Sequence, residues 1–417
     1  MPKRVEKEPS HGRGLDRRIF VKTSGAAAAA SAGALILSKF APSVLAQPMR
    51  PKADKIDNRL YFLTVEGSPY DRGYQHGQAL RYVIQSGIAR WKQWINETLE
   101  QSDAEIEVAE FVQGTDFMGA ILKHTPDLYV ELQGIAAGAN VDFNTLYAYN
   151  MFDEFVSFTV QKYRLAFCTG FGVYGRKNLP NIIGQNNDLP TYFDRTQTLL
   201  WVKQADGFET FVFTFAGLLA NNGVNNASLG CTINIMPAHV KGALDGLPMP
   251  YVVRGILERR TRSEAVAFVK SVGQYAGPMN YIIGDPSGVS TVETGDNFFQ
   301  VYDDYNGEKY VPHSNHPLAE TSKVKPGEVS KSPERLAKLV ELIGGKVGEI
   351  DVEAARRIFR TFPILKNYQT DPNFPTLESV IIELDPANPR ISIAAGPPDI
   401  FKYSTFDFQK GFVGTET

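Results

Sequence analysis

The spacing of hydrophobic positions divides the chain into a helical part and a later part that is rich in strands. Between Pro69 and about Glu154, apolar residues recur at steps of three and four, which is typical of helices that bury one face. Two such runs are Leu80, Val83, Ile84, Ile88 and Trp91, and Leu128, Leu132, Ile135, Ala136 and Ala139. Pro69, Pro126 and Asp142 are of types that begin helices. We therefore expect helices and no strand in this stretch.

After Leu165 the pattern changes to short β-branched and aromatic runs that are separated by turn residues. Three pairs of such runs predict β-hairpins. They are 198–203 with 210–215, 281–284 with 289–293, and 380–384 with 390–394. Helical spacing returns at about 263–273, 333–343 and 352–359. Hairpins interleaved with helices predict antiparallel sheets with helices packed outside, which is an α+β layered domain.

The composition favours a globular protein that acts on small molecules. The 417 residues are 43% hydrophobic, which is enough to bury a large core. The net charge of −3 gives no reason to expect a nucleic-acid partner, because proteins that bind nucleic acids carry a basic face. The chain has two cysteines, which are too few for a disulfide framework.

Residues 1–46 resemble an export signal rather than a folded element. The pair Arg17-Arg18 is followed by Phe20 and Lys22, and an alanine-rich run then leads to Val44-Leu45-Ala46, a suitable cleavage site. This order is typical of a twin-arginine signal peptide. The alanine-rich run is short and weakly apolar for a retained membrane anchor. We therefore expect a periplasmic or secreted protein without stable membrane insertion.

Cys168 lies where the helical pattern gives way to strands, and it opens the first of them. A cysteine in this place can be a small core residue. The polar motifs around and after it point to chemistry instead. In chain order they are Cys168-Thr169, Gly184-Gln185-Asn186-Asn187-Asp188, the Asn/Gly-rich stretch 221–234, His313-Ser314-Asn315-His316 and Ser332-Pro333-Glu334-Arg335.

Together with the upstream stretch 67–77, this order of motifs resembles the penicillin acyltransferase-like family of cysteine N-terminal-nucleophile hydrolases. The resemblance implies a four-layer αββα sandwich with a helical N-terminal prosegment. It further implies self-cleavage between Phe167 and Cys168, with Thr169 following the family pattern. Residues 47–167 would then form a small chain and residues 168–417 a large catalytic chain, and the two would stay associated. Phe167 departs from the family, which usually has glycine before the nucleophile.

The implied chemistry suits these residue types. The Cys168 thiol would attack the Phe167 carbonyl, and cleavage would expose an α-amine. Its pKa of about 7.7 to 8 lets it act as general base for the thiol, whose ordinary pKa is about 8.5. The Asn234 amide is a suitable oxyanion donor. Asp188 would orient the ammonium group, and the family match assigns Arg335 to stabilising charge or holding the loop over the site.

Each of these residues also has a structural interpretation. Asp188 could be a turn residue, Asn234 could satisfy backbone groups at a strand end, and Arg335 could be a solvated helix residue. Cys231 lies in an apolar run and is expected in the core, although a disulfide to Cys168 would suit an oxidising compartment.

Other kinds of site receive less support. His313 and His316 leave open a Cys/His thiol protease. A zinc site at these histidines lacks further ligands at usual spacings, and the stretch 221–230 lacks the Gly-Lys-Ser/Thr ending of a phosphate loop. We therefore expect no metal and no cofactor.

The function expected from the sequence is hydrolysis or transfer of an acyl group at a linear amide, such as an N-acyl amine, amino acid or peptide. Hydrolysis is favoured because acyl-coenzyme A is scarce outside the cytoplasm. Phe171, Tyr192 and Phe193 are candidate pocket walls because they lie near site residues in the sequence. The alternative from another class is a non-catalytic periplasmic binding protein with the same fold.

Overall fold

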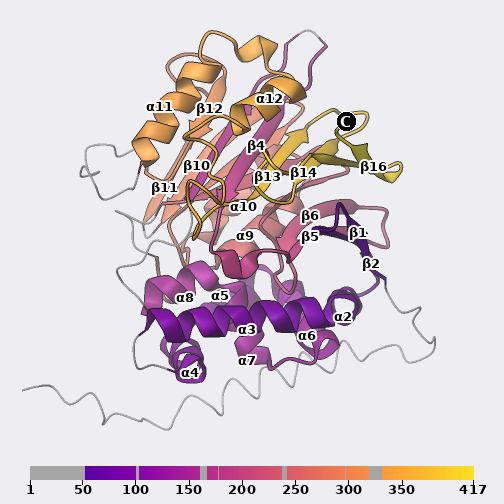
Figure 1. Cartoon of the computed structure of the whole chain (residues 1–417), viewed down its shortest axis with the longest axis vertical. Helices are drawn as coiled ribbons and strands as arrows, with labels where there is room; N and C mark the ends of the chain where they lie inside the picture. Colours follow the sequence, from indigo (N-terminus) through magenta and orange to yellow (C-terminus); the bar gives the residue numbers. More distant parts are fainter. Residues whose placement is uncertain are drawn as a thin grey trace, which may run out of the picture. The chain divides into compact units, whose positions relative to one another are not determined.

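The computed structural model describes residues 52–99, 103–159, 167–176, 178–236, 242–295, 297–318 and 331–417. Two units can be distinguished, residues 1–47 and residues 48–417. The first unit, which contains the predicted signal peptide, lies outside the described residues. The second unit contains two β-sheets and several groups of helices (Figure 1). Among the described residues no helix is long and apolar enough to span a bilayer.

The larger sheet has nine strands in the order β1-β2-β5-β6-β7-β8-β9-β10-β11. Neighbouring strands are antiparallel except for β2 and β5, which are parallel. The strands are β1 (Asp54–Ile56), β2 (Leu60–Glu66), β5 (Gln197–Lys203), β6 (Glu209–Phe215), β7 (Asn222–Asn225), β8 (Gly230–Ile235), β9 (Met279–Asp285), β10 (Gly288–Gly295) and β11 (Phe298–Tyr302). The predicted hairpins β5–β6 and β9–β10 are confirmed by their antiparallel pairing.

The smaller sheet has seven antiparallel strands in the order β12-β3-β4-β13-β14-β15-β16. They are β12 (Tyr310–His313), β3 (Phe167–Val173), β4 (Ile182–Asp188), β13 (Thr376–Glu383), β14 (Arg390–Ala394), β15 (Ser404–Asp407) and β16 (Gly411–Thr415). The third predicted hairpin, β13–β14, is confirmed. Cys168 is the second residue of β3, and β3 lies between β12 and β4 in this sheet.

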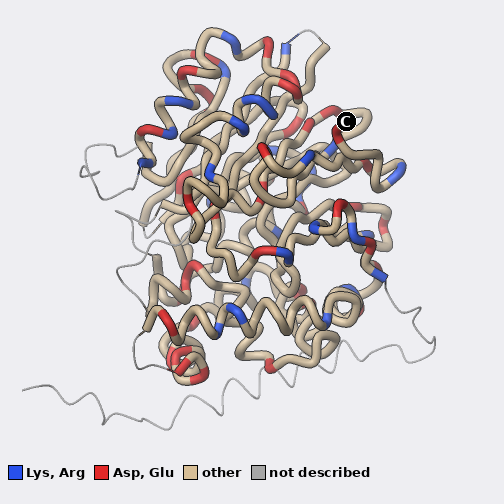
Figure 2. Tube along the Cα trace, in the orientation of Figure 1, with Lys and Arg blue, Asp and Glu red and all other residues tan. Residues whose placement is uncertain are grey.

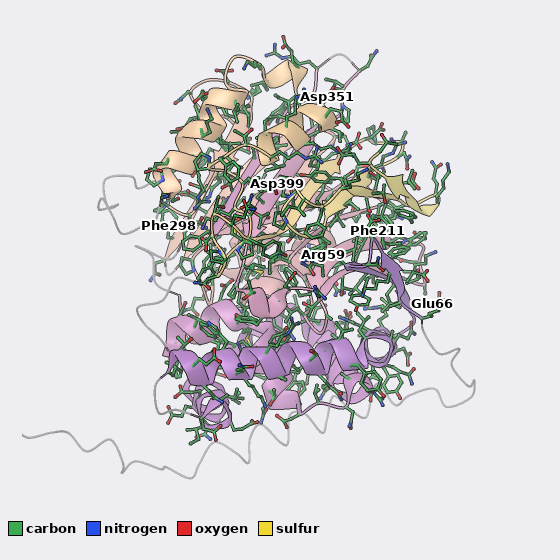
Figure 3. All side chains as sticks on the ribbon, in the orientation of Figure 1. Arg59, Glu66, Phe211, Phe298, Asp351 and Asp399 are labelled. Atoms are coloured by element: carbon green, nitrogen blue, oxygen red, sulfur yellow. The ribbon has the colours of Figure 1, made fainter. Side chains whose placement is uncertain are left out.

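The two sheets pack face to face, and side chains fill the space between them (Figure 3). A Cβ placed on Gly170 of β3 would lie 3.2 Å from Ile282 of β9, so the two sheets approach closely there. The helices α9 (Met249–Leu257) and α10 (Arg262–Val272) cover the larger sheet, and α11 (Ser332–Ile343) and α12 (Val352–Phe359) cover the smaller one. The predicted αββα sandwich is thereby confirmed.

The segment before Cys168 is mainly helical, as predicted. Its helices are α2 (Pro69–Ala79), α3 (Arg81–Thr98), α4 (Ala104–Gly114), α5 (Phe117–His124), α6 (Pro126–Ala139), α7 (Phe143–Asn150) and α8 (Phe152–Thr159). The predicted starts at Pro69, Pro126 and Asp142 are confirmed, and Ser68 and Asp142 cap their helices through side-chain oxygens.

The same segment also supplies two strands that the sequence pattern did not reveal. β1 and β2 extend the nine-stranded sheet beside β5. Arg59 lies between these strands and is labelled in Figure 3. It contacts Asp194, Tyr368 and the ring of Phe401. A pocket of about 210 Å³ lies beside Arg59 and is lined by none of the predicted site residues.

Helices α2 and α6 pack closely because glycines face each other along their contact. A Cβ placed on Gly73 would lie 1.9 Å from the Glu131 carbonyl oxygen, and one on Gly134 would lie 2.2 Å from that of Tyr70. Only a residue without a side chain permits this approach. The sequence shows the two pairs of glycines four residues apart, but their contact is a tertiary feature.

A buried ion cluster joins these helices to the sandwich. Glu131 of α6 accepts two hydrogen bonds from Arg254 of α9, at 2.6 and 3.0 Å, and one from Arg72 of α2 at 3.3 Å. His76 accepts a hydrogen bond from the backbone N–H of Gly217 at 3.1 Å, and burial lowers the pKa of His76 to about 4. These contacts link the small-chain segment to the predicted large chain.

Candidate active site

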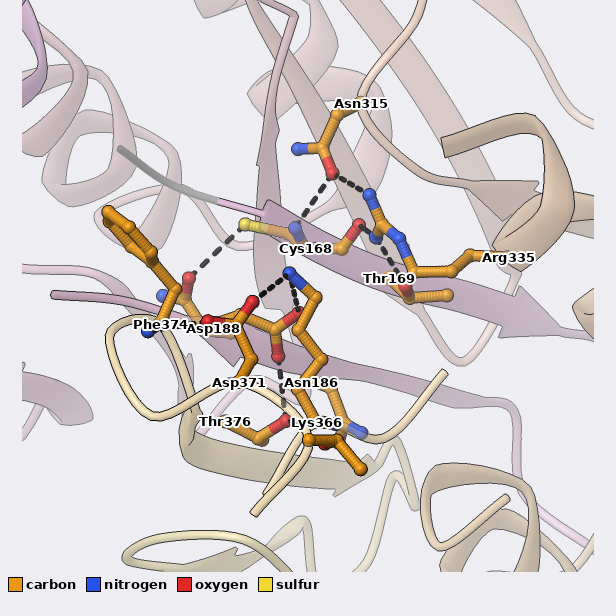
Figure 4. Close-up of polar contacts among 12 residues, drawn as sticks. Cys168, Thr169, Asn186, Asp188, Asn315, Arg335, Lys366, Asp371, Phe374 and Thr376 are labelled. Atoms are coloured by element: carbon orange, nitrogen blue, oxygen red, sulfur yellow. Dashed lines mark hydrogen bonds and ion pairs between the residues drawn. The ribbon is translucent and has the colours of Figure 1, made fainter. Parts of the chain in front are cut away.

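Cys168 is the second residue of β3 and is 2% exposed. Its Sγ donates to Oδ1 of Asn187 at 3.2 Å, and its backbone N–H donates to Oδ1 of Asn315 at 2.9 Å (Figure 4). Phe167 precedes it in the same strand and faces Asp188 of β4 in the sheet register.

Arg335 holds the backbone on the other side of Cys168. Its guanidinium donates to the Cys168 carbonyl oxygen at 2.6 Å, to Oγ1 of Thr169 at 2.7 Å and to Oδ1 of Asn315 at 2.5 Å (Figure 4). The side chain comes from α11 and is 1% exposed. The structure thus brings Arg335 and Thr169 to Cys168, and the interpretation of Arg335 as a solvated helix residue is wrong.

Asp188 ends β4 and is also buried. Its Oδ1 accepts a hydrogen bond from Oγ1 of Thr376 at 2.6 Å, and Nζ of Lys366 lies 3.9 Å from its Oδ2. Oδ2 has no hydrogen-bond partner among the described residues. Burial raises the pKa of Asp188 to about 6, against the opposing effects of Lys366, Arg335 and Thr376.

Asn234 lies on β8, across the interior from β3. Its Oδ1 accepts a hydrogen bond from Asn280 at 3.0 Å, while its Nδ2 has no hydrogen-bond partner among the described residues. A Cβ built on Gly170 would lie 3.6 Å from this nitrogen. Asn234 therefore presents a buried donor to β3 two residues beyond Cys168, without a direct hydrogen bond to it.

Phe167 is held by residues of a loop that follows α12. Nζ of Lys366 lies 3.9 Å from the centre of the Phe167 ring, and the ring of Phe374 meets it edge-on at 5.9 Å. Lys366 also pairs with Asp371 at 3.0 Å (Figure 4). The residue before the proposed cleavage bond therefore has a defined position.

The thiol of the uncleaved chain is neutral. Burial raises the pKa of Cys168 far above its usual range, and the carboxyls of Asp188 and Asp153 raise it further. Arg335 and the backbone amide of Ile235 act in the opposite direction. A thiol is a weak nucleophile until it loses its proton, so chemistry at Cys168 requires a base or a change of environment.

The other predicted residues are mostly packed in the hydrophobic core. Cys231 is fully buried and unpaired, which confirms it as a core residue. Phe171 packs on Phe359 beneath α12, and Tyr192 and Phe193 pack on each other in the core near α3 and α8. These contacts account for all three aromatic residues as core packing rather than pocket walls.

The two motif histidines are engaged away from Cys168. Nε2 of His313 contacts Glu293 at 2.9 Å, and Nδ1 of His316 contacts Oγ of Ser332 at 2.7 Å. Neither is hydrogen-bonded to the thiol, so the geometry gives no support to a Cys/His pair. Among the described residues, no group of three or more His, Cys, Asp or Glu side chains could hold a metal ion.

Several polar residues at the site were not predicted. Asn187 and Asn315 lie inside two of the motifs quoted from the sequence. Their positions beside Asp188 and His316 were the sequence features that could have identified them. Lys366, Thr376 and Glu378 come from a late segment that contains no recognised motif. Only the pairing of β13 with β4 brings this segment to the site.

A curated relative is similar in sequence to 61% of the chain. The chain is 28% identical over 261 residues to the 40 kDa form of acyl-coenzyme A:6-aminopenicillanic-acid acyltransferase from Emericella nidulans, which is 61% of this chain and 69% of that protein. This similarity confirms the resemblance to the penicillin acyltransferase-like family. The relative that the chain resembles is an acyltransferase by name.

Solved structures show more distant likenesses to this chain. Penicillin V acylase from Agrobacterium tumefaciens gives a TM-score of 0.41 at 13% identity, covering 58% of this chain and 87% of that one. A mutant of conjugated bile acid hydrolase from Clostridium perfringens gives 0.36 at 12% identity, covering 59% and 92%. No protein-family model matches the chain. The fold assignment rests on the two sheets and their covering helices.

Proposed function

We propose that the chain cuts itself between Phe167 and Cys168 and that Cys168 then hydrolyses or transfers the acyl group of linear amides. The observation that carries this proposal is the setting of the Cys168 backbone. Its N–H donates to Asn315 and its carbonyl accepts from Arg335, and both partners are buried. Buried backbone groups always need partners, but here side chains supply both of them, so the backbone at Cys168 is held on either side of the thiol.

Self-cleavage exchanges one acyl bond for another. The Cys168 sulfur attacks the Phe167 carbonyl carbon, the C–N bond breaks, and the thiol proton passes to the departing nitrogen. Water then hydrolyses the thioester, giving a Phe167 carboxylate and a free thiol. The nitrogen that becomes the α-amine already has an acceptor in Oδ1 of Asn315 at 2.9 Å.

The new amine is the base for substrate turnover. An α-amine has a pKa of about 7.7 to 8, so it can take the thiol proton near neutral pH. The buried positive charge of Arg335, which is bonded to the Cys168 carbonyl, disfavours protonation of this amine. Asp188 favours protonation, because its carboxylate would attract the ammonium group. The balance between the two sets the pH at which the enzyme works.

The remaining roles follow from where charge develops. Nδ2 of Asn234 is a buried donor without a partner among the described residues, and it is proposed to stabilise the oxyanion. Loss of one oxyanion donor typically costs about 100- to 1,000-fold in rate. The guanidinium of Arg335 is proposed to fix the Cys168 carbonyl and the Thr169 hydroxyl in place during the reaction.

The test compares Cys168→Ala and Cys168→Ser with Cys231→Ser as the matched control. Wild type and Cys231→Ser should give two fragments under denaturing conditions, one of them starting Cys168-Thr169-Gly170. The Ala protein should remain a single chain without amidase activity, and the Ser protein should cleave slowly and turn over little. Active wild-type protein without a chain starting at Cys168, or with undiminished activity after alkylation of that thiol, would refute the proposal.

The substrate class is tested with N-acyl amines, amino acids and peptides that carry fatty or aryl acyl groups. Because a relative is named for 6-aminopenicillanic acid and acyl-coenzyme A, these two compounds form the test for transfer. Release of amine without acyl transfer supports hydrolysis. An intact wild-type chain that binds such amides without turnover supports the binding-protein alternative.

Export through the twin-arginine route is part of the proposal. It rests on Arg17 and Arg18 and on the alanine-rich run that follows. The double substitution Arg17→Lys and Arg18→Lys should retain the protein in the cytoplasm, while wild type reaches the periplasm or medium. Equal export of both proteins would contradict this route.

A further inference from the structure

A buried carboxylate lies behind the nucleophile, one strand beyond its neighbour. In the smaller sheet Cys168 of β3 faces Asn187 of β4, and Asn187 faces Glu378 of β13. The three residues therefore form a continuous row across three adjacent strands. Glu378 is 0% exposed, and the mechanism proposed above gives it no task.

The carboxylate of Glu378 accepts hydrogen bonds from three asparagine side chains. Nδ2 of Asn221 lies at 2.7 Å and Nδ2 of Asn187 at 3.4 Å, and Nδ2 of Asn222 is the third donor. Oδ1 of the same Asn187 amide accepts the Cys168 thiol at 3.2 Å. One amide thus connects the carboxylate to the sulfur.

We propose that Glu378 is a positioning residue, which holds the Asn187 amide with its oxygen turned towards Cys168. This inference rests on the proposed function of Cys168. A carboxylate accepts hydrogen bonds and cannot donate them, so each asparagine amide must point its NH₂ group, and not its oxygen, at Glu378. The oxygen of Asn187 must then face the thiol. It directs the S–H bond and favours the protonated form of the sulfur in the resting site.

The charge state of Glu378 is sensitive to its surroundings. Burial raises its pKa to about 7, while the hydrogen bonds from Asn222, Asn187 and Asn221 lower it. These amides are the groups that face the carboxyl from β4 and from the β7 side, and no charged residue of the described part is among the causes of the shift. Protonation would put an O–H where the amides now donate and would release Asn187.

A purely structural role predicts something different. If Glu378 only fills space between the sheets, any side chain of similar shape that folds should leave the thiol unchanged. If it orients Asn187, the replacement must still offer an acceptor to that amide. Gln meets this requirement because its oxygen can accept from Asn187 and Asn221. Oδ1 of Asn222, which has no hydrogen-bond partner among the described residues, can turn to accept the N–H of Gln.

The experiment compares Glu378→Met, Glu378→Gln and Glu378→Asp in the full chain, with Glu383→Gln on the same strand as control. Thiolate formation is followed by the rate at which iodoacetamide labels Cys168 against pH, because this rate tracks the thiolate fraction even well below the pKa, and each protein is compared with its Cys168→Ala counterpart. Self-cleavage is timed in the same samples. The Asp variant keeps the charge but is one methylene shorter, so the 3.4 Å contact to Asn187 is lost.

In the Met protein we expect the apparent pKa of Cys168 to fall by about one unit, because the freed amide can turn its N–H to the sulfur. Below that pKa the thiolate fraction, and with it the rate of self-cleavage, should rise about tenfold. Asp should behave like Met. The self-cleavage rate of the Gln protein should stay within about threefold of the wild-type rate, and that of Glu383→Gln should equal the wild-type rate. If the Glu378→Met protein does not fold, the thiol titration of the Glu378→Asp protein tests the same expectation.

Unchanged titration in the Met and Asp proteins, or equal shifts in Met and Gln, would overturn the inference. The second result would mean that charge rather than amide orientation matters. If wild type neither cleaves itself nor releases amine, the proposed function fails instead. The thiol titrations would still decide the role of Glu378, so the two failures are distinguishable.

Discussion

Replacing Asp188 by Asn should change how the stability of the uncleaved chain depends on pH. The Asp188 carboxyl is buried, has a single hydrogen bond from Thr376 at 2.6 Å, and lies 3.9 Å from the nearest cation, Lys366. Burial raises its pKa to about 6, compared with 3.8 ordinarily. The folded chain therefore binds this proton more tightly than the unfolded chain does.

The magnitude follows from the difference between the two pKa values. At roughly 1.4 kcal/mol per pKa unit, it corresponds to about 3 kcal/mol. Since the folded-state pKa is raised, Asp188 lowers the stability progressively as pH rises from about 4 to about 6, and the full loss is present above pH 6. Asn does not titrate, so it removes this component. Its extra N–H has no evident acceptor, which adds a cost that is independent of pH.

The assay is urea unfolding of Cys168→Ala and of Cys168→Ala with Asp188→Asn, from pH 4 to pH 7. The Cys168→Ala background prevents self-cleavage, and all other titrating groups are common to both proteins. The difference in unfolding free energy should change by about 3 kcal/mol in favour of Asn as pH rises. Parallel pH profiles would refute the reasoning, because they would mean that the Asp188 carboxyl is not destabilised by burial.

Two further predictions concern the contacts of the segment before Cys168. Arg254→Met should destabilise the chain by about 3 to 5 kcal/mol, measured by urea unfolding, because Glu131 is left as a buried charge with Arg72 alone at 3.3 Å. Gly134→Ala should cost about 1 to 3 kcal/mol in the same assay, because the added methyl would lie 2.2 Å from the Tyr70 carbonyl oxygen and would force α2 and α6 apart.

Matched controls separate these effects from general sensitivity. Arg260 is 61% exposed and its ion pair with Asp206 is 4.0 Å long, so Arg260→Met should change stability by less than about 0.5 kcal/mol. A Cβ on Gly119 would meet nothing closer than 3.6 Å, so Gly119→Ala should be neutral or stabilising. An Arg254 or Gly134 variant that matched its control would contradict the corresponding prediction.

The distribution of charge shows why each ion pair must be judged by its own burial. Acidic and basic residues are interspersed over the described part of the chain (Figure 2). Most exposed pairs contribute little to stability. The charges that matter most for stability are buried ones, such as Glu131 with Arg254, Asp188, Arg335 and Glu378.

Local patterns in the sequence determined the helices, the hairpins and the place of the candidate nucleophile. The capped starts at Pro69 and Asp142, the turn at Asp206-Gly207 and the change of pattern before Cys168 depend on neighbouring residues only. Hydrophobic spacing and turn chemistry act over a few positions, so they can be read without the fold. The ordered motifs then brought Cys168, Asp188 and Arg335 together as candidates.

Tertiary structure decided what surrounds the nucleophile. The Asn187–Glu378 hydrogen bond joins residues 191 positions apart, and it exists because β13 lies beside β4 in one register. Neither residue is marked by local periodicity, since both look like ordinary strand residues. The orientation of an amide and the pKa of a carboxyl depend on burial and on partners from other strands, which only the folded chain brings together.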